Sequence, residues 1–205
     1  MHRLKQIFAW WLIGLGSFFV FLGTRDFLDS RFGQSQAERE FHNSVPDSVP
    51  RLQPGDTFAK LMIPRLGTEL YVVEGDDDSE LRRAPGHLSG SAMPGGKGNC
   101  IIAGHRDTHF RVLKDIRAGD DIVLETRAGE YLYRVSDTQI VAPSNTALLE
   151  DGPKPKLSLV TCYPFYYVGA APKRFIVQAR LAGEVTADAA IREYSPSLSP
   201  ATLRR

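Results

Sequence analysis

The chain is poor in the residues that mark many cofactor, metal and nucleic-acid sites. Its 205 residues include two cysteines and five histidines, and 25 basic and 24 acidic residues leave a formal net charge of +1. Nucleic-acid binding requires a concentrated basic face, which this balance does not indicate. No Walker, dinucleotide-fold or zinc-spaced Cys/His motif is present either. We therefore expect no nucleic-acid partner and no cofactor.

One feature suggests a metal, the acidic run Asp76-Asp77-Asp78. Hard cations such as Ca²⁺ prefer carboxylate oxygens, but the run lacks the spaced ligands and the fixed loop of an EF-hand. A solvated turn is the better interpretation. The sequence therefore predicts no obligatory metal.

Charge is absent from residues 7–23, close to the N-terminus. This length is at the short end of what spans a bilayer core, for which ~20 residues are typical. A cleaved signal peptide is the alternative, but the run is long for the apolar part of such a peptide, and no small-x-small cleavage site follows it. Because Arg3 and Lys5 precede the run, we expect residues 1–24 to form a cytoplasmic stub and a transmembrane signal anchor. The N-terminus then lies inside, and the rest of this single-pass chain lies outside the cytoplasmic membrane.

The remainder divides into a stalk, a folded domain and a tail. Residues 24–45 are rich in charge, and both a helical stalk and a disordered spacer fit them. Prolines 46, 50 and 54 mark a linker, so we assign residues 25–55 to the stalk and linker. The folded domain is expected at residues 56–183, and residues 184–205 are expected to form a flexible tail.

Short strands separated by turn residues dominate the expected domain, which indicates an all-β barrel or sandwich. We expect hairpin turns between strands at Gly119-Asp120 and at Ala128-Gly129. Short helices are expected at 79–84 and 111–116, and a long loop at 84–98. We expect strands near 57–63, 69–73, 99–104, 121–126, 130–135, 137–142, 157–162 and 174–181.

Three of these strands end or begin at residues with catalytic chemistry. Cys162 ends an apolar run and is followed at once by Tyr163-Pro164, where no strand can continue, so its thiol is both held and reachable. His105 follows the apolar run 99–104, and Arg174 opens the run 174–177. A thiol with a base and a cation beside it is the arrangement of a nucleophilic cysteine. The sequence therefore predicts a Cys/His/Arg site and acyl transfer through a thioester.

The second cysteine and two further histidines are rivals for these roles. A disulfide between Cys100 and Cys162 is ordinary for an exported chain, but a disulfide sulfur cannot attack as a thiolate. We expect Cys100 to be an inert, buried thiol within a strand. His87 and His109 are the alternative bases.

The motifs around these residues resemble those of sortases, the membrane-anchored cysteine transpeptidases of bacterial cell surfaces. Residues 158–162, Ser-Leu-Val-Thr-Cys, match the family's TLxTC motif with Ser in place of the first Thr. Residues 98–110 resemble its histidine segment, and residues 163–177 its cysteine-to-arginine segment. The resemblance covers roughly residues 55–183 and is strongest for the class D-like or proteobacterial type. It implies a closed, sortase-like eight-stranded β-barrel with one or two short helices.

The resemblance also implies a role for each site residue. Cys162 is the nucleophile, His105 the general acid and base, and Arg174 the donor that stabilises the oxyanion or the substrate. Thr161 and Asp107 are supporting residues. Asp107 orients His105 or Arg174 in one interpretation and forms a turn in the other.

The implied partners are a surface protein with a C-terminal LPxTG-like sorting signal and an amine acceptor on the cell wall or on a protein. Two alternatives stay open. One is a membrane-anchored cysteine endopeptidase or amidase, in which water resolves the thioester. The other is a catalytically silent, surface-binding β-barrel. The order of the chain, with His before Cys, speaks against papain-like and related peptidases, in which the cysteine precedes the histidine.

Overall fold

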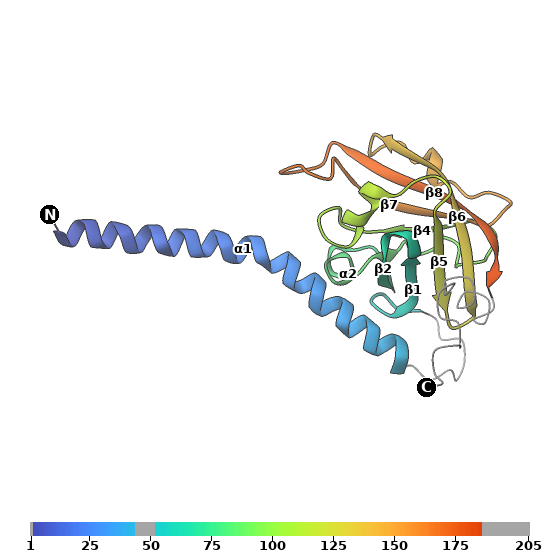
Figure 1. Cartoon of the computed structure of the whole chain (residues 1–205), viewed down its shortest axis with the longest axis horizontal. Helices are drawn as coiled ribbons and strands as arrows, with labels where there is room; N and C mark the ends of the chain where they lie inside the picture. The colour runs from blue at the N-terminus through green and yellow to red at the C-terminus, as the bar shows by residue number, and fades with distance from the viewer. Residues whose placement is uncertain (1, 44–51, 186–205) are drawn as a thin grey trace, which may run out of the picture.

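The computed structural model describes residues 2–43 and 52–185 (Figure 1). It shows one long helix, α1 (His2–Asn43), whose second half lies against a barrel built from the rest of the described chain. The helical alternative for the stalk is thus the one observed up to Asn43. Pro46 and Pro50 of the expected linker lie outside the described residues, as does the expected tail beyond Val185.

Eight strands form a closed barrel, in agreement with the expected all-β fold. Around the barrel the order is β1-β2-β3-β4-β7-β8-β6-β5, and β5 pairs with β1 to close it. Most neighbours are antiparallel, but β2 runs parallel to β3 and β4 runs parallel to β7. The strands are β1 (Thr57–Ile63), β2 (Thr68–Glu74), β3 (Gly86–His87), β4 (Asn99–Ala103), β5 (Asp121–Thr126), β6 (Gly129–Val141), β7 (Lys156–Tyr163) and β8 (Lys173–Val185).

Two strand predictions were wrong in detail. The strands expected at 130–135 and 137–142 are one strand, β6, whose register against β8 shifts between Val135 and Asp137. A bulge of this kind interrupts the alternation of side chains without ending the strand. In addition, the loop expected at 84–98 contains the short strand β3, which pairs with β2 and β4.

Short helical segments connect the strands close to where they were expected. One is the helix α2 (Asp78–Arg83), which begins within the acidic run. Another is the 3₁₀ segment η2 (His109–Asp115), which buries Phe110 and Leu113. The remaining 3₁₀ turns are η1 (Pro64–Leu66) and η3 (Ala147–Leu149).

The inward faces of the strands make one apolar core. Burial of each large apolar side chain contributes about 1.5–3 kcal/mol, so this core is the main source of stability. Its largest fully buried members are Tyr133, Phe110, Leu61, Ile63, Ile102, Leu113, Ile122, Leu124, Leu157 and Leu159.

The second half of α1 packs on β1, β2 and α2. Gly33 and Ala37 are buried, and a side chain at Gly33 would meet the backbone of Arg83. Gln34 forms two hydrogen bonds with the backbone of Tyr71: its Nε2 donates to the carbonyl at 3.0 Å, and its Oε1 accepts from the N–H at 2.7 Å. Residues 30–43 are therefore packed on the barrel, although the expected domain boundary at residue 56 leaves them out.

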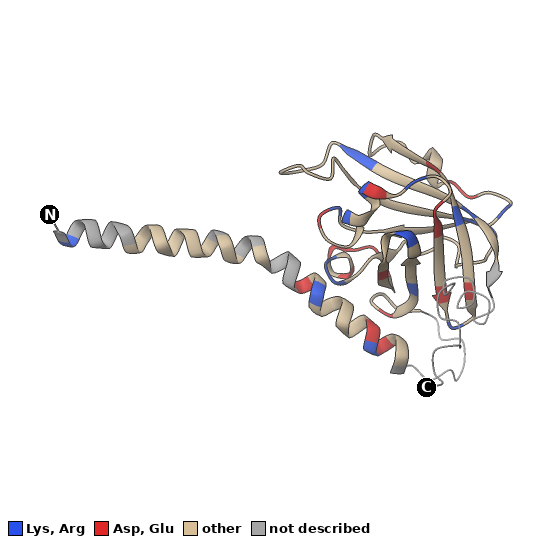
Figure 2. Cartoon of the chain, in the orientation of Figure 1, with Lys and Arg blue, Asp and Glu red and all other residues tan. Residues whose placement is uncertain are grey.

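The first half of α1 extends away from the barrel (Figure 1). Lys, Arg, Asp and Glu residues are spread over the barrel and the part of α1 that lies on it, and a basic residue is also present near the N-terminus of α1 (Figure 2). Among the helices of residues 2–43 and 52–185, none contains a described stretch long and apolar enough to cross a membrane. The anchor expected in residues 1–24 stays a prediction.

Candidate functional site

Three neighbouring strands bring Cys162, His105 and Arg174 to one end of the barrel. Cys162 on β7 lies opposite Arg174 on β8 in the antiparallel register. The parallel pairing of β4 with β7 ends with Ala103 opposite Val160, so His105 follows β4 at the same edge. The topology thus assembles the three side chains predicted from separate segments.

Thr161 fixes the start of the histidine loop, residues 104–108 between β4 and η2, against β7. Its side chain is 2% exposed, and its hydroxyl donates to the carbonyl of Gly104 at 2.6 Å. The N–H of Gly104 donates in turn to the carbonyl of Val160 at 3.1 Å. This pair of hydrogen bonds gives Thr161 a structural basis for its expected supporting role.

The histidine loop folds back tightly on itself after Gly104. The N–H of Phe110 donates to the carbonyl of His105 at 2.9 Å, and the Phe110 ring packs over Gly104. A Cβ at position 104 would lie 2.8 Å from that ring, closer than real contacts allow. Glycine is therefore required immediately before His105.

Cys162, His105 and Arg174 are all partly exposed, as a site open to substrate requires. Within the part of the chain that the structure describes, no hydrogen bond joins these three side chains. Arg174 donates from Nη1 to the carbonyls of Ala171 at 3.4 Å and Lys173 at 3.2 Å. Catalytic hydrogen bonds are often long or absent until a substrate is bound.

The two thiols differ in environment. Both cysteines are free, but Cys100 is buried and Cys162 is partly exposed. Desolvation, with a smaller contribution from the Glu74 carboxylate, raises the pKa of the Cys100 thiol to about 12. Because only the thiolate is an efficient nucleophile, Cys100 is inert at neutral pH.

Both rival histidines are buried and engaged elsewhere. His87 Nδ1 lies 2.7 Å from Glu74 Oε2, and its Nε2 lies 2.9 Å from Ser91 Oγ. His109 Nδ1 lies 3.3 Å from Ser30 Oγ of α1, and burial lowers the pKa of His109 to about 4. A contact with the backbone of Arg82 acts in the opposite direction. Of these three candidate bases, His105 is therefore the one that is exposed enough to serve as an acid or base.

Two cavities border the histidine loop. The smaller, of about 240 Å³, is lined by His105, Asp107 and Thr108 together with Asp78 and Arg82 of α2. Asp107 is exposed and makes no hydrogen bond to His105 among the described residues, so any influence on His105 is through its charge. No group of three or more His, Cys, Asp or Glu side chains in residues 2–43 and 52–185 is placed to hold a metal ion.

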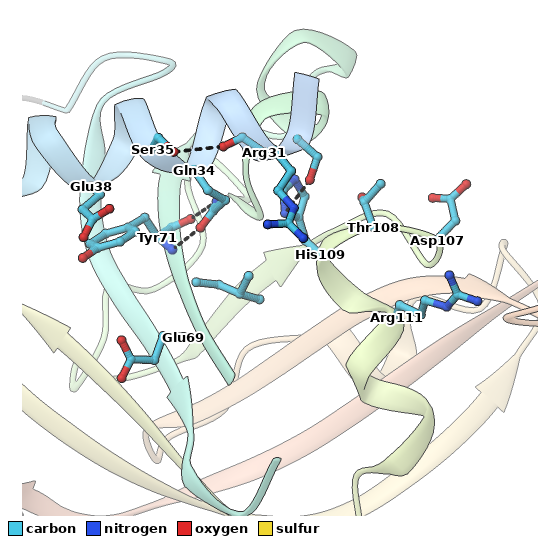
Figure 3. Close-up of a pocket in the computed structure, with 12 residues that line it drawn as sticks. Arg31, Gln34, Ser35, Glu38, Glu69, Tyr71, Asp107, Thr108, His109 and Arg111 are labelled. Carbon is cyan, nitrogen blue, oxygen red and sulfur yellow. Dashed lines mark hydrogen bonds between the residues drawn. The ribbon is translucent and has the colours of Figure 1, made fainter. Parts of the chain in front are cut away.

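The larger cavity, of about 620 Å³, lies between α1, β2 and the histidine loop (Figure 3). Asp107 and Arg111 lie at one side of it and Glu69 and Glu38 at the other. Because residues of α1 and of the histidine loop both line this cavity, the docked part of α1 lies next to the loop that carries His105.

Sequence reasoning missed two contacts of this loop. One is the contact of Ser30 with His109, and the other is a pair of hydrogen bonds from Arg106 to the loop between β7 and β8. Arg106 directly follows His105, but nothing in its residue type identified a partner 61 residues away.

Comparison with known proteins gives consistent relatives. A family model described as a Sortase domain matches residues 61–182. Sortase D of Bacillus subtilis is 38% identical over 129 residues, which cover 62% of this chain and 65% of that protein. Sortase SrtE1 of Streptomyces coelicolor is 32% identical over 151 residues, covering 64% and 42%. The chain therefore spans less than two thirds of the length of both curated relatives.

Solved structures agree in fold. The structure of a Clostridium perfringens Sortase D5 transpeptidase superposes with a TM-score of 0.64 at 26% identity, covering 76% of this chain and 99% of that one. The family match over residues 61–182 covers more than half of the sequence. The family assignment therefore rests on the sequence as well as on the shape of the barrel. The chain belongs to the sortase family.

Proposed function

We propose that this protein is a membrane-anchored cysteine transpeptidase that cleaves a peptide bond in a sorting signal and transfers the acyl group to an amine on the cell surface. The observation that carries the proposal is the placement of Cys162. It is a free, partly exposed thiol at the end of β7, opposite Arg174 in the register and beside the loop that begins at Gly104.

In the first half-reaction, Cys162 Sγ attacks the carbonyl carbon of the scissile bond and the carbonyl oxygen becomes an oxyanion. Arg174 stabilises this oxyanion with a guanidinium that stays charged and offers donors in a fixed plane. His105 gives a proton to the departing amine, the carbon–nitrogen bond breaks and an acyl thioester remains on Cys162.

In the second half-reaction, an acceptor amine attacks the thioester carbonyl and loses a proton to His105. The carbon–sulfur bond breaks, Cys162 leaves as the thiolate and a new amide forms. Thr161 holds the histidine loop against β7 in both steps through its hydrogen bond to Gly104. Asp107 is proposed as a supporting residue because it lines the same cavity as His105.

We propose an LPxTG-like sorting signal at the C-terminus of a surface protein as the first substrate, and a cell-wall or protein amine as the acceptor. The pattern of motifs around Cys162 and His105, typical of sortases, supports this assignment. No cofactor and no metal take part in the proposed reaction.

We further propose that residues 1–24 anchor the protein in the cytoplasmic membrane, with the N-terminus inside and the barrel at 56–183 outside. The uncharged run 7–23 after Arg3 and Lys5 supports this topology. So does the exposure of Trp10, Trp11 and Phe21 on α1. Residues 25–55 then connect the anchor to the barrel. The tail expected at 184–205 is proposed to start after β8, which ends at Val185.

A product assay tests the function. The protein is incubated with a quenched fluorescent LPxTG-type peptide, with and without a short amine-bearing peptide, and the products are identified by mass spectrometry. Transpeptidation predicts a ligated product that grows with the amine concentration at the expense of the hydrolysed one. Hydrolysis alone indicates the endopeptidase or amidase, and no turnover indicates the silent barrel.

A further inference from the structure

The loop between β7 and β8, residues 164–172, connects the nucleophile to Arg174 and contains no helix or strand. Its tip projects into solvent, with Tyr166 71% and Val168 99% exposed. A loop with an exposed, largely apolar tip and no ladder hydrogen bonds of its own adopts one conformation only if contacts from elsewhere hold it.

Arg106 supplies such contacts. Its Nη2 donates to the carbonyls of Tyr167 at 2.9 Å and Gly169 at 3.0 Å. The guanidinium carbon lies 5.7 Å from the centroid of the Tyr167 ring, in the range of a cation–π contact. Its Nη1 is buried and has no hydrogen-bond partner in the described part of the chain. This guanidinium is therefore partly buried, with one edge bonded to the backbone of the loop.

The same loop contacts Arg174 at its other end. The carbonyl of Ala171 accepts a hydrogen bond from Arg174 Nη1 at 3.4 Å. Two arginines thus hold consecutive parts of one loop through backbone carbonyls, and one of them directly follows His105 in the sequence. The position of this loop consequently links the histidine segment to the side chain that faces Cys162 across the β7–β8 pair.

We propose that Arg106 is a positioning residue, which fixes the β7–β8 loop so that Arg174 and the entrance to Cys162 keep the geometry that acylation needs. Arg106 acts through the loop and does not touch the reacting atoms. This inference rests on the proposed function for its effect on turnover, whereas its effect on the loop is independent of that function.

Arg106→Lys is the informative variant because it keeps the charge. An ammonium cannot reproduce the planar group that stacks on Tyr167 while one nitrogen reaches two carbonyls. Arg117→Lys is the matched control, since Arg117 is an exposed arginine outside this loop. Both variants are made in the full chain and studied in detergent, and thermal unfolding checks that the barrel remains folded.

The first measurement is limited proteolysis with chymotrypsin, with cleavage after Tyr166 or Tyr167 quantified by mass spectrometry. We expect cleavage about tenfold faster in Arg106→Lys than in the wild type, at an unfolding temperature within a few degrees of it. The control should match the wild type. Equal cleavage rates in all three proteins would overturn the proposal.

The second measurement is steady-state turnover of the LPxTG-type peptide. We expect kcat/KM to fall about tenfold or more in Arg106→Lys and to stay unchanged in Arg117→Lys. Faster loop cleavage combined with an unchanged kcat/KM would show that Arg106 holds the loop without positioning the site, and would overturn the proposal. If the wild type itself turned over no peptide, the proposed function would fail, and the cleavage rates would still decide whether Arg106 fixes the loop.

Discussion

At the scale of single residues, environment separates the cysteine with a proposed catalytic role from the other. Cys100 is on β4 and Cys162 is on β7, and these two strands pair with each other. Cys100 is buried and the pKa of its thiol is raised, whereas Cys162 is partly exposed at the end of its strand. The sequence allowed this distinction because an apolar run continues past Cys100 and stops at Cys162. The burial of His87 and His109 could not be predicted in the same way, because no local sequence pattern marks either residue as buried.

Substitution of Arg174 and His105 tests the roles proposed for them. Arg174→Lys keeps the charge and loses the planar set of donors, so acylation should slow by on the order of 10²-fold. His105→Asn should slow both acylation and resolution, because each step moves a proton. Single-turnover acylation followed by mass spectrometry measures the first step directly. A variant that acylates at nearly the wild-type rate would reduce its residue to a structural role.

At the scale of elements, the contact of α1 with α2 depends on Gly33. A Cβ at this position would lie 2.5 Å from both Cα and the carbonyl oxygen of Arg83, so one helix must move. Gly33→Ala should lower the unfolding temperature even though alanine favours a helix by up to ~1 kcal/mol over glycine. Gly16→Ala is the control, since nothing lies within 4 Å of its Cβ position. Thermal unfolding decides, and a Gly33→Ala protein as stable as the wild type would contradict the packing.

His109 should make the stability of this region depend on pH. Its pKa of about 4 in the folded protein is below the ordinary 6.5, so between these values the unfolded chain binds more protons. The contribution is present above pH 6.5 and is lost as pH falls toward 4, on the order of 3 kcal/mol in total. The charge of Asp107 acts against this shift and that of His105 adds to it.

Urea unfolding of the wild type and of His109→Asn, measured from pH 7 to pH 4.5, checks this expectation. The variant should lose much less stability than the wild type across that range, whatever its stability at pH 7. Parallel pH profiles for the two proteins would show that His109 is not the group responsible.

The fold could be predicted in outline because strand alternation and turn residues are local signals. Merging of the two expected strands into β6 was not predicted, since the bulge at Val135–Asp137 breaks the alternation while the pairing with β8 continues. The placement of Cys162, His105 and Arg174 at one end followed from three strand ends. The contacts of Ser30 and Arg106 span 79 and 61 residues, and no local pattern encodes them.

For the whole molecule, the docked half of α1 changes where the folded unit begins. A chain that starts at residue 52 lacks the Gln34 bonds to Tyr71 and the Ser30 contact with His109, whereas a chain that starts at residue 29 keeps both contacts. We expect the shorter chain to unfold at a temperature lower by about 5 °C or more, and the longer one to match the full chain. Differential scanning calorimetry measures the unfolding temperatures of the two shortened chains and the full chain. Equal unfolding temperatures would show that the folded unit begins near residue 56, as the sequence predicts.

The central claim is that Cys162 forms a thioester with the peptide substrate. The most direct measurement is mass spectrometry of the protein mixed with an LPxTG-type peptide and quenched in acid, followed by mapping of the modified residue. We predict an acyl adduct on Cys162 in the wild type and in Cys100→Ala, and none in Cys162→Ala, which should keep its fold because the Cys162 side chain is partly exposed and is not part of the apolar core. An adduct on Cys100, or turnover that persists in Cys162→Ala, would contradict the account.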